Sequence, residues 1–240
     1  MKSFLASIAF CTRIPVPAHF DAADVGKAAH WFPLVGLLLG VAYASMAFLL
    51  TPRFPPSVVA VLIVTAEALL TGGLHFDGLA DMADGFGGGK TREDILRIMR
   101  DQAIGSYGAS ALILVVALKV TAVASLIVRH AAVRYLLLAP ALGRWSMVLL
   151  SRLFPYARPS EAVSRHIGTS ELVWATALTG CSAILVAKWQ SIVCWVAVTG
   201  VSMLFGQICF RRIGGVTGDT LGANEQICES IVLIAALAMK

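Results

Sequence analysis

Charged side chains are scarce in this sequence: Asp, Glu, Lys and Arg together make up only 14% of its 240 residues. The mean hydropathy is +0.81, and apolar residues account for 58% of the chain. A composition so poor in polar groups excludes an ordinary soluble domain. Stretches of about 20 mostly apolar residues recur along the chain, which is typical of helices that span a membrane.

Cysteine is also sparse, and the five cysteines form no CxxC pair. Most lie in apolar runs, which favours a packing role over zinc binding or disulfides. At the amino end, KSFLASIAF is followed by Arg13 and two prolines instead of a small-residue cleavage site, so we expect no removable signal peptide and a short interfacial or re-entrant piece. No repeat of about 20–50 residues is visible, so an inverted-repeat transporter has no support in the sequence.

The apolar stretches predict an all-α fold, a polytopic integral membrane helical bundle with about seven transmembrane helices. We expect residues 1–240 to form a single catalytic domain, because the spans leave no room for a separate globular unit. The expected spans are 32–50, 57–74, 105–128, 135–151, 171–187, 190–210 and 223–239.

Basic residues predict the orientation of these spans. If the amino terminus lies in the cytoplasm, twelve Lys and Arg residues fall on the cytoplasmic side and five on the outer side, the asymmetry of the positive-inside rule. The acidic stretch and the loops of Arg158 and Asp219 then share the cytoplasmic face. The twelve are Lys2, Arg13, Lys27, Lys90, Arg92, Arg97, Arg100, Arg152, Arg158, Arg165, Arg211 and Arg212, and the five are Arg53, Arg129, Arg134, Lys188 and Lys240.

The most strongly charged stretch is 75–101, HFDGLADMADGFGGGKTREDILRIMRD, which holds six of the fourteen acidic residues. Asp77, Asp81 and Asp84 are spaced i, i+4, i+7, so a helix would present them on one face. Like charges on one face repel each other unless a cation lies among them, and a set of oxygen ligands favours Mg²⁺ or Mn²⁺ over zinc. The alternative is a solvated acidic helix start.

Four further charges, Glu67, Lys119, Arg144 and Glu229, lie within expected spans. Ionisable groups at membrane depth are costly, and they usually face a cavity or pair with one another. We expect a functional cavity, and the alternative is a structural ion pair between Glu67 and Lys119.

The segment FGGGKT resembles the end of a phosphate-binding P-loop, but Asp84 stands where the first glycine is required and no strand precedes it. We instead expect a hinge followed by an interfacial helix over 91–101 on the cytoplasmic side, which begins with a capping box of Thr91 and Asp94. Its arginines, Arg92, Arg97 and Arg100, could bind phosphate or anionic lipid equally well.

Two more features leave alternatives open. His75 could orient a carboxylate or a phosphate, or it could be an ordinary hydrogen-bonding residue at a helix end. Glu225 and Glu229 are spaced i, i+4 on the last helix, after a glycine-rich loop that carries Asp219. We expect this helix to pack against the acidic helix and complete one cavity with it. The alternative is an exposed polar helix end at the membrane interface.

At this point the residues are similar to a known family. HFDGLADMADGFGGG, followed by IMRDQAIGSYG, resembles the signature of the cobalamin synthases, which are adenosylcobinamide-GDP ribazoletransferases. The resemblance covers nearly the whole chain in the right order. It includes FCTRIPVP at 10–17, FPLVGLLLG at 32–40, RW at 144–145, PYARP at 155–159 and GGVTGDTLGANEQICE at 214–229.

The resemblance implies that α-ribazole or its 5′-phosphate attacks adenosylcobinamide-GDP, with release of GMP, and that Mg²⁺ is needed. It also implies a bacterial cytoplasmic (inner) membrane location and small-molecule and lipid partners, with no nucleic acid. The expected catalytic residues are His75, Asp77, Asp81 and Asp84, of which the three aspartates hold the metal. The expected substrate-binding residues are Arg13, Arg100, Asp101, Arg144, Arg158, Asp219, Glu225 and Glu229.

Two other functions remain open. The spacing DGxxDxxDG is similar to that of membrane CDP-alcohol phosphotransferases, so a lipid phosphotransferase is one alternative, although Asp81 stands where their motif has Ala. A cation transporter that uses Glu67, Asp77 and Glu229 is the other.

Overall fold

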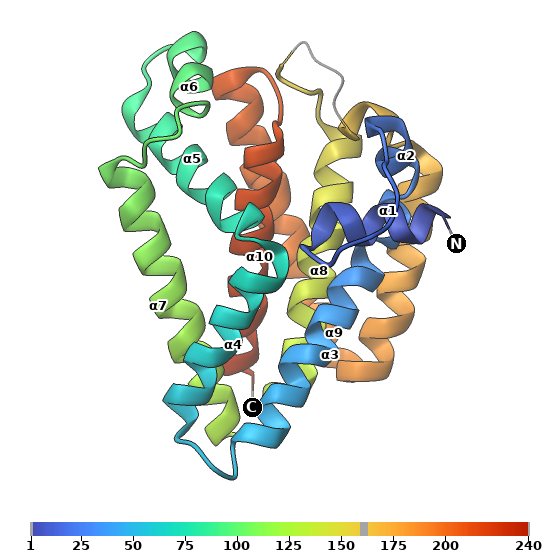
Figure 1. Cartoon of the computed structure of the whole chain (residues 1–240), viewed down its shortest axis with the longest axis vertical. Helices are drawn as coiled ribbons and strands as arrows, with labels where there is room; N and C mark the ends of the chain where they lie inside the picture. Colours follow the sequence, from blue (N-terminus) through green and yellow to red (C-terminus); the bar gives the residue numbers. More distant parts are fainter. Residues whose placement is uncertain (1, 159–162, 240) are drawn as a thin grey trace.

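The computed structural model describes residues 2–158 and 163–239, which form a bundle of helices packed side by side (Figure 1). The fold is 82% helical with no strand in the described residues, so the expected all-α class is confirmed. In chain order the helices are α1 (Lys2–Cys11), α2 (Ala22–Lys27), η1 (Ala29–Trp31), α3 (Phe32–Leu50), α4 (Pro56–Thr71), α5 (Leu74–Gly88), α6 (Arg92–Ile98), α7 (Ser106–Val128), α8 (Ala132–Leu153), η2 (Val163–His166), α9 (Thr169–Ile213) and α10 (Gly218–Ala238).

Helices α8 and α10 form the centre of the bundle. In α8, 83% of the most apolar window is buried, against 28% in α7 at the periphery. Helix α8 packs against α3, α9 and α10. Large apolar side chains are instead exposed on the outer helices, as expected where lipid replaces water. They include Phe48, Leu69, Ile113, Leu114, Leu185 and Val196.

Two glycines one turn apart let α3 approach α8 closely. A Cβ on Gly36 would overlap the carbonyl group of Pro140, and one on Gly40 would lie 2.6 Å from the carbonyl oxygen of Leu136. Pro140 has no N–H, so the carbonyl of Leu136 has no helical donor at that position. Small residues at this spacing are typical of helix pairs in membranes, where close backbone contact drives association.

Helix length and hydropathy alone do not confirm the expected count of seven spanning helices. Five helices are long and apolar enough to cross a membrane, or six if α4 and α5 are counted as one bent span. The expected span 57–74 falls short because α4 ends at Thr71 and has only 16 residues. The expected spans 171–187 and 190–210 both lie within α9, which has 45 residues and breaks at Lys188. Gly180 lies against Trp195, so the two halves of α9 fold back on each other.

Helix α6 is shorter than the expected helix over 91–101, because it ends at Ile98. The helix begins where the sequence predicted, because the Thr91 hydroxyl accepts a hydrogen bond from the Asp94 backbone N–H at 3.2 Å. Arg92 donates to the backbone carbonyls of Ile213 at 2.8 Å and Ala157 at 2.6 Å. This arginine therefore ties α6 to the end of α9 and to the loop after α8.

A turn of two glycines separates α4 from α5 and bends the chain by 90°. Gly72 has φ +65° and Gly73 has φ +70°, in the left-handed region that glycine adopts at little cost. Gly72 also lies beneath the Arg13 side chain, so a Cβ there would overlap it, whereas a Cβ on Gly73 would meet nothing within 4 Å. Both positions of the turn therefore favour glycine because of their backbone conformation, and Gly72 also because the Arg13 side chain leaves no space for a Cβ.

We expect Gly73→Ala to lower the free energy of unfolding by about 1–2 kcal/mol, the cost of a left-handed non-glycine residue. Gly72→Ala should lower it further, because the Arg13 side chain must also move. Thermal unfolding of both purified variants in the same detergent measures the difference. Equal melting temperatures for the two variants would contradict the predicted contact between Gly72 and Arg13.

Candidate active site

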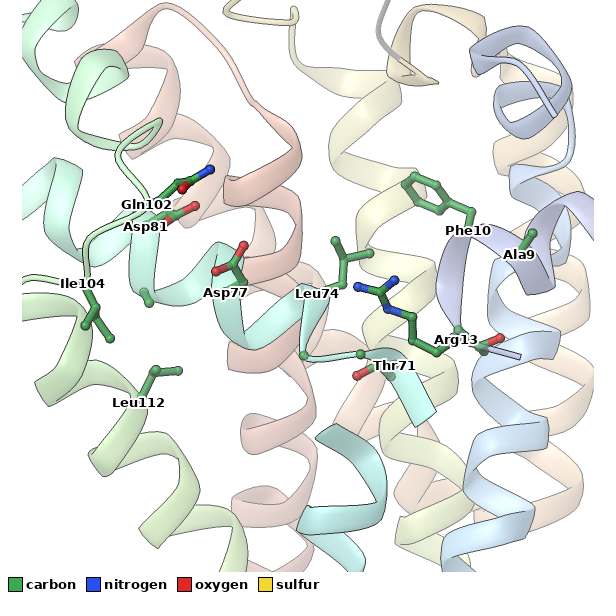
Figure 2. A pocket seen from close by; sticks show the side chains of 14 residues that line it. Ala9, Phe10, Arg13, Thr71, Leu74, Asp77, Asp81, Gln102, Ile104 and Leu112 are labelled. Atoms are coloured by element: carbon green, nitrogen blue, oxygen red, sulfur yellow. The ribbon is translucent and has the colours of Figure 1, made fainter. Parts of the chain in front are cut away.

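A cavity of about 750 Å³ opens where α1, the turn between α4 and α5, and the start of α7 meet (Figure 2). In Figure 2, Asp77, Asp81 and Gln102 lie toward one end of the cavity, and the guanidinium of Arg13 lies toward the other. The cavity is lined by Ala9, Phe10, Thr12, Arg13, Thr71, Gly72, Gly73, Leu74, Asp77, Ala80, Asp81, Gln102, Ile104 and Leu112.

Asp77 and Asp81 bring two negative charges to the cavity wall. Both lie on α5, which is not one of the five helices that qualify as spans by themselves. Partial burial, together with the negative charges of Asp77 and Asp219, raises the pKa of Asp81 to about 6. A divalent cation would remove this repulsion, so the two carboxylates fit a metal that binds oxygen ligands.

Asp84, the third aspartate of the row, has a different environment. Its two carboxylate oxygens accept hydrogen bonds from the backbone N–H groups of Gly105 at 2.7 Å and Gly108 at 2.8 Å. These are donors at the amino end of α7, which has no other side-chain cap. Asp84 does not line the cavity, and the structure gives it a structural contact that neither the expected metal site nor the alternative of a solvated helix start included.

The expected meeting of the acidic helix with the C-terminal helix is present. Asp219 lies at the start of α10, and a Cβ on Gly78 of α5 would be 2.7 Å from its carbonyl oxygen. The Arg158 guanidinium donates to the Asp219 carboxylate at 2.9 Å. Thus α5, the loop after α8 and the start of α10 lie at one end of the bundle. Neither Arg158 nor Asp219 lines the cavity.

Sequence reasoning missed part of the cavity wall near the start of α7. Arg100 and Asp101 were expected to bind substrate, yet both are exposed and neither lines the cavity. The Asp101 carboxylate accepts a hydrogen bond from the Ala103 N–H at 3.1 Å. Gln102 and Ile104 line the cavity instead. Both residues lie in the string IMRDQAIGSYG that carries the family resemblance, but neither is charged, so neither was expected to bind substrate.

Inside the bundle, seven side chains form what we call the buried charge network: Glu67, His75, Lys119, Arg144, Glu225, Gln226 and Glu229. Arg144 is 0% exposed and forms ion pairs with both Glu225 and Glu229. His75 Nδ1 lies 3.1 Å from Glu225 Oε2, and since a carboxylate only accepts, we assign the Nδ1 proton to this bond. His75 thus contacts a carboxylate, although not that of an expected metal ligand.

The other half of the network is centred on Lys119. Its Nζ donates to Glu67 at 2.6 Å, to Gln226 at 2.7 Å and to Glu229 at 2.7 Å. The Gln226 amide also donates to Glu67 at 2.8 Å and to Glu225 at 3.0 Å. The ion pair between Glu67 and Lys119 is therefore present, as the structural alternative required.

The network is closed in this structure. The space between Tyr43, Glu67, Lys119 and Glu229 is about 20 Å³, room for about one water molecule. The functional cavity expected among the charges of the spans is not there. Four residues expected at the site do not line the 750 Å³ cavity: His75, Arg144, Glu225 and Glu229. The network that they form is connected to the cavity through helices α5 and α10. The predicted roles of these residues in binding or catalysis remain predictions.

A family model described as Cobalamin-5-phosphate synthase matches residues 3–237. The chain belongs to the cobalamin-5-phosphate synthase family. Family membership confirms the resemblance carried by HFDGLADMADGFGGG and the other strings. The matched residues include all those that line the cavity and all those of the buried charge network.

Relatives that carry the name adenosylcobinamide-GDP ribazoletransferase match over nearly their full length. One from Syntrophobacter fumaroxidans is 39% identical, with 98% of this chain and 98% of the relative covered. One from Shewanella sp. strain ANA-3 is 41% identical, covering 98% of this chain and 94% of the relative. One from Prosthecochloris aestuarii is 38% identical, covering 95% of this chain and 94% of the relative. No solved structure matches this member of the cobalamin-5-phosphate synthase family.

We expect Lys119→Met to lower the free energy of unfolding by about 3–5 kcal/mol, because it leaves Glu67 buried without a cation and leaves Glu229 paired with Arg144 alone. Adding Glu67→Leu should restore part of this loss, since the uncompensated charge of Glu67 is then removed. Unfolding of the single and double variants in detergent measures the coupling. A loss of stability in the double variant equal to the sum of the losses in the two single variants would show that the two charges are not coupled.

Proposed function

We propose that this protein is the transferase that joins adenosylcobinamide-GDP to α-ribazole or its 5′-phosphate and releases GMP, in the last steps of cobalamin biosynthesis. Family membership and the name shared by its relatives support this reaction. The observation that carries the proposal is the pair Asp77 and Asp81 at an open cavity. Within the described residues, neither carboxylate is in an ion pair, which leaves both for a metal ion at the substrate diphosphate.

In the proposed reaction, a ribose hydroxyl oxygen of the acceptor forms a bond to the phosphorus on the cobinamide side of the diphosphate. The bond from this phosphorus to the bridging oxygen breaks, and GMP leaves with the electron pair. The hydroxyl proton passes to a base or to water. Transfers of this kind depend on charge neutralisation and alignment more than on covalent chemistry by the protein.

We propose Mg²⁺ as the cofactor, held by Asp77 and Asp81. In the described residues no group of three or more His, Cys, Asp or Glu side chains is arranged to hold a metal. Mg²⁺ commonly binds through only one or two carboxylates and completes its shell with water and substrate phosphates, so two aspartates suffice. The bound ion would neutralise charge on the diphosphate and on the leaving GMP. Asp84 would support this pair by holding the amino end of α7.

We further propose that the cavity faces the cytoplasm from the bacterial inner membrane. Basic residues of α6 and the end of α9 gather near α5: Arg212 donates to the carbonyls of Phe86 and Gly89, both at 3.2 Å. Arg97 and Arg211 lie on the same two helices. The positive-inside rule assigns such an end to the cytoplasmic side.

The two alternative functions have less support. A cation transporter would need Glu67 and Glu229 to be accessible, and both are buried in ion pairs with Lys119. A lipid phosphotransferase would carry Ala in place of Asp81, and the relatives bear the name of a different transferase.

The proposed reaction predicts that purified protein in lipid vesicles releases GMP when it is given adenosylcobinamide-GDP, α-ribazole and Mg²⁺. Release should require the acceptor, and omission of α-ribazole is the control. Quantification of GMP and of the cobalamin product by chromatography makes the measurement. Absence of GMP, or GMP formed equally well without acceptor, would refute the proposed transfer.

Replacement of the two proposed metal ligands should have a larger catalytic effect than replacement of Asp84. We expect Asp81→Asn to lower turnover on the order of 10²-fold or more and to raise the Mg²⁺ concentration needed for half-maximal rate. Asp84→Asn should mainly lower stability, by about 1 kcal/mol, through loss of one bond at the start of α7. The matched control is Asp94→Asn on α6, outside the cavity. Near wild-type turnover of Asp81→Asn at limiting Mg²⁺ would rule out the assignment.

A further inference from the structure

We propose that a groove at the end of the bundle away from α6 binds an anionic phospholipid, with its phosphate on basic side chains and part of one acyl chain in the groove. This far groove has a volume of about 280 Å³ and lies between the turn after α3 and the turn after α7. Figure 1 shows these two turns at the bottom of the bundle and α6 at the top. The proposal does not depend on the proposed transferase reaction.

The far groove lies at the level expected for lipid headgroups. Helices α3 and α7 end beside it and α8 begins beside it, and all three are long and apolar enough to cross a membrane. The ends of such helices lie where the hydrocarbon core meets the polar headgroups. Phe48 and Val133 on its walls are 76% and 48% exposed, so the groove is open to the surroundings of the bundle. A lipid can therefore enter it from the membrane.

The walls of the far groove are mainly apolar. Of the eight residues that line it, only Thr51 and His130 have polar side chains. The Thr51 hydroxyl donates to the carbonyl of Ala47 at 2.6 Å, so its hydrogen is already used within its own helix end. The volume is slightly below the usual range for sites that enclose a whole small molecule. These properties fit part of an acyl chain better than a compact polar ligand.

Arginines flank the far groove on both sides, since Arg53 follows its lining residue Pro52 and Arg129 precedes its lining residue His130. Within the described residues, neither arginine forms an ion pair. Each guanidinium donates through Nη1 to one backbone carbonyl at a helix end, at 3.0 Å for Arg53 and 2.6 Å for Arg129. Each therefore retains further N–H donors for a ligand.

This part of the chain offers no acid that could balance these charges. Residues 25–66 and 102–160 contain no Asp or Glu, so α3, α7, α8 and the turns that line the far groove carry none. The counter-charge therefore comes from a ligand. A phosphate is the fitting group, because guanidinium binds it through paired, charge-assisted hydrogen bonds. An anionic phospholipid carries this phosphate and an acyl chain in one molecule, which matches the basic rim and the apolar walls.

The backbone at His130 places a third donor at the far groove. His130 has φ +55° just after α7, and the next N–H, of Ala131, donates to the carbonyl of Leu126 at 2.9 Å. Glycine is the usual residue in such a left-handed helix end, because a side chain there costs free energy. Here an imidazole lies against the groove instead. Its N–H can donate to a phosphate oxygen together with the two arginines.

The test measures thermal unfolding of the purified protein in nanodiscs of phosphatidylcholine, with and without phosphatidylglycerol. A ligand that binds only the folded protein stabilises it, so we expect phosphatidylglycerol to raise the wild-type midpoint by about 2–4 °C. Arg53→Gln should lose most of this increase. Arg97→Gln, on α6 at the other end of the bundle, is the matched control and should keep it.

His130→Gly separates ligand binding from folding. In phosphatidylcholine alone its midpoint should equal or exceed that of the wild type, because glycine adopts the left-handed conformation at little cost. The increase produced by phosphatidylglycerol should be smaller than in the wild type, because the imidazole is gone. A lower midpoint in phosphatidylcholine together with an undiminished increase would contradict the role of His130 as a phosphate donor.

Three results would overturn the proposal. If Arg53→Gln and Arg97→Gln reduce the increase equally, general surface charge explains it. If inorganic phosphate reproduces the increase in phosphatidylcholine nanodiscs, no acyl chain is needed. Native mass spectrometry gives a readout that does not depend on stability, and we expect the wild type to retain phosphatidylglycerol in preference to phosphatidylcholine and Arg53→Gln to retain less. A wild-type dimer without bound phosphatidylglycerol would instead assign the groove to a second copy of the chain.

Discussion

The pairing of buried charges along α10 is the constraint on which the rest of the bundle depends. Arg144 of α8 and Lys119 of α7 both form ion pairs with Glu229, and each has a second acid in Glu225 or Glu67. A buried charge without its partner is strongly unfavourable, so these contacts allow little choice in the depth and rotation of α10 relative to its neighbours. With α10 fixed, Asp219 in its first turn lies beside Arg158 and against Gly78.

The buried charge network also influences the cavity, because one of its members, His75, lies on the same helix as Asp77. His75 is hydrogen-bonded to Glu225, and a Cβ on Gly222 of α10 would lie 3.2 Å from the Cα of His75. Residues two apart on a helix point about 200° away from each other. Holding His75 toward α10 therefore turns Asp77 away from the core and toward the cavity. The bend at Gly72 and Gly73 completes the arrangement, because it carries α5 across the end of the bundle. The role of His75 is in this respect one of position.

Much of this arrangement was predictable from the sequence. Residue spacing placed Asp77 and Asp81 on one helix face, and the same argument brought α10 against α5. The sequence could not predict that Asp84 accepts two hydrogen bonds from the start of α7, because that contact depends on how a distant glycine segment packs. Gln102 was missed because an uncharged side chain in a loop shows no periodicity. A functional cavity was wrongly expected among the charged residues of the spans. In the sequence, residues that pair with one another and residues that line a cavity both appear as isolated ionisable residues within apolar stretches. Only packing distinguishes the two outcomes.

The position of Glu225 and Glu229 in chain order has a consequence for synthesis of the protein in the cell. Lys119 and Arg144 belong to helices made long before α10, and until then their only acidic partner from the network is Glu67. Before α10 is made, Lys119 and Arg144 lie at membrane depth with only Glu67 to balance their charge. Glu225 and Glu229 complete the ion pairs afterwards. The earlier helices therefore cannot reach their final packing before α10 has been made.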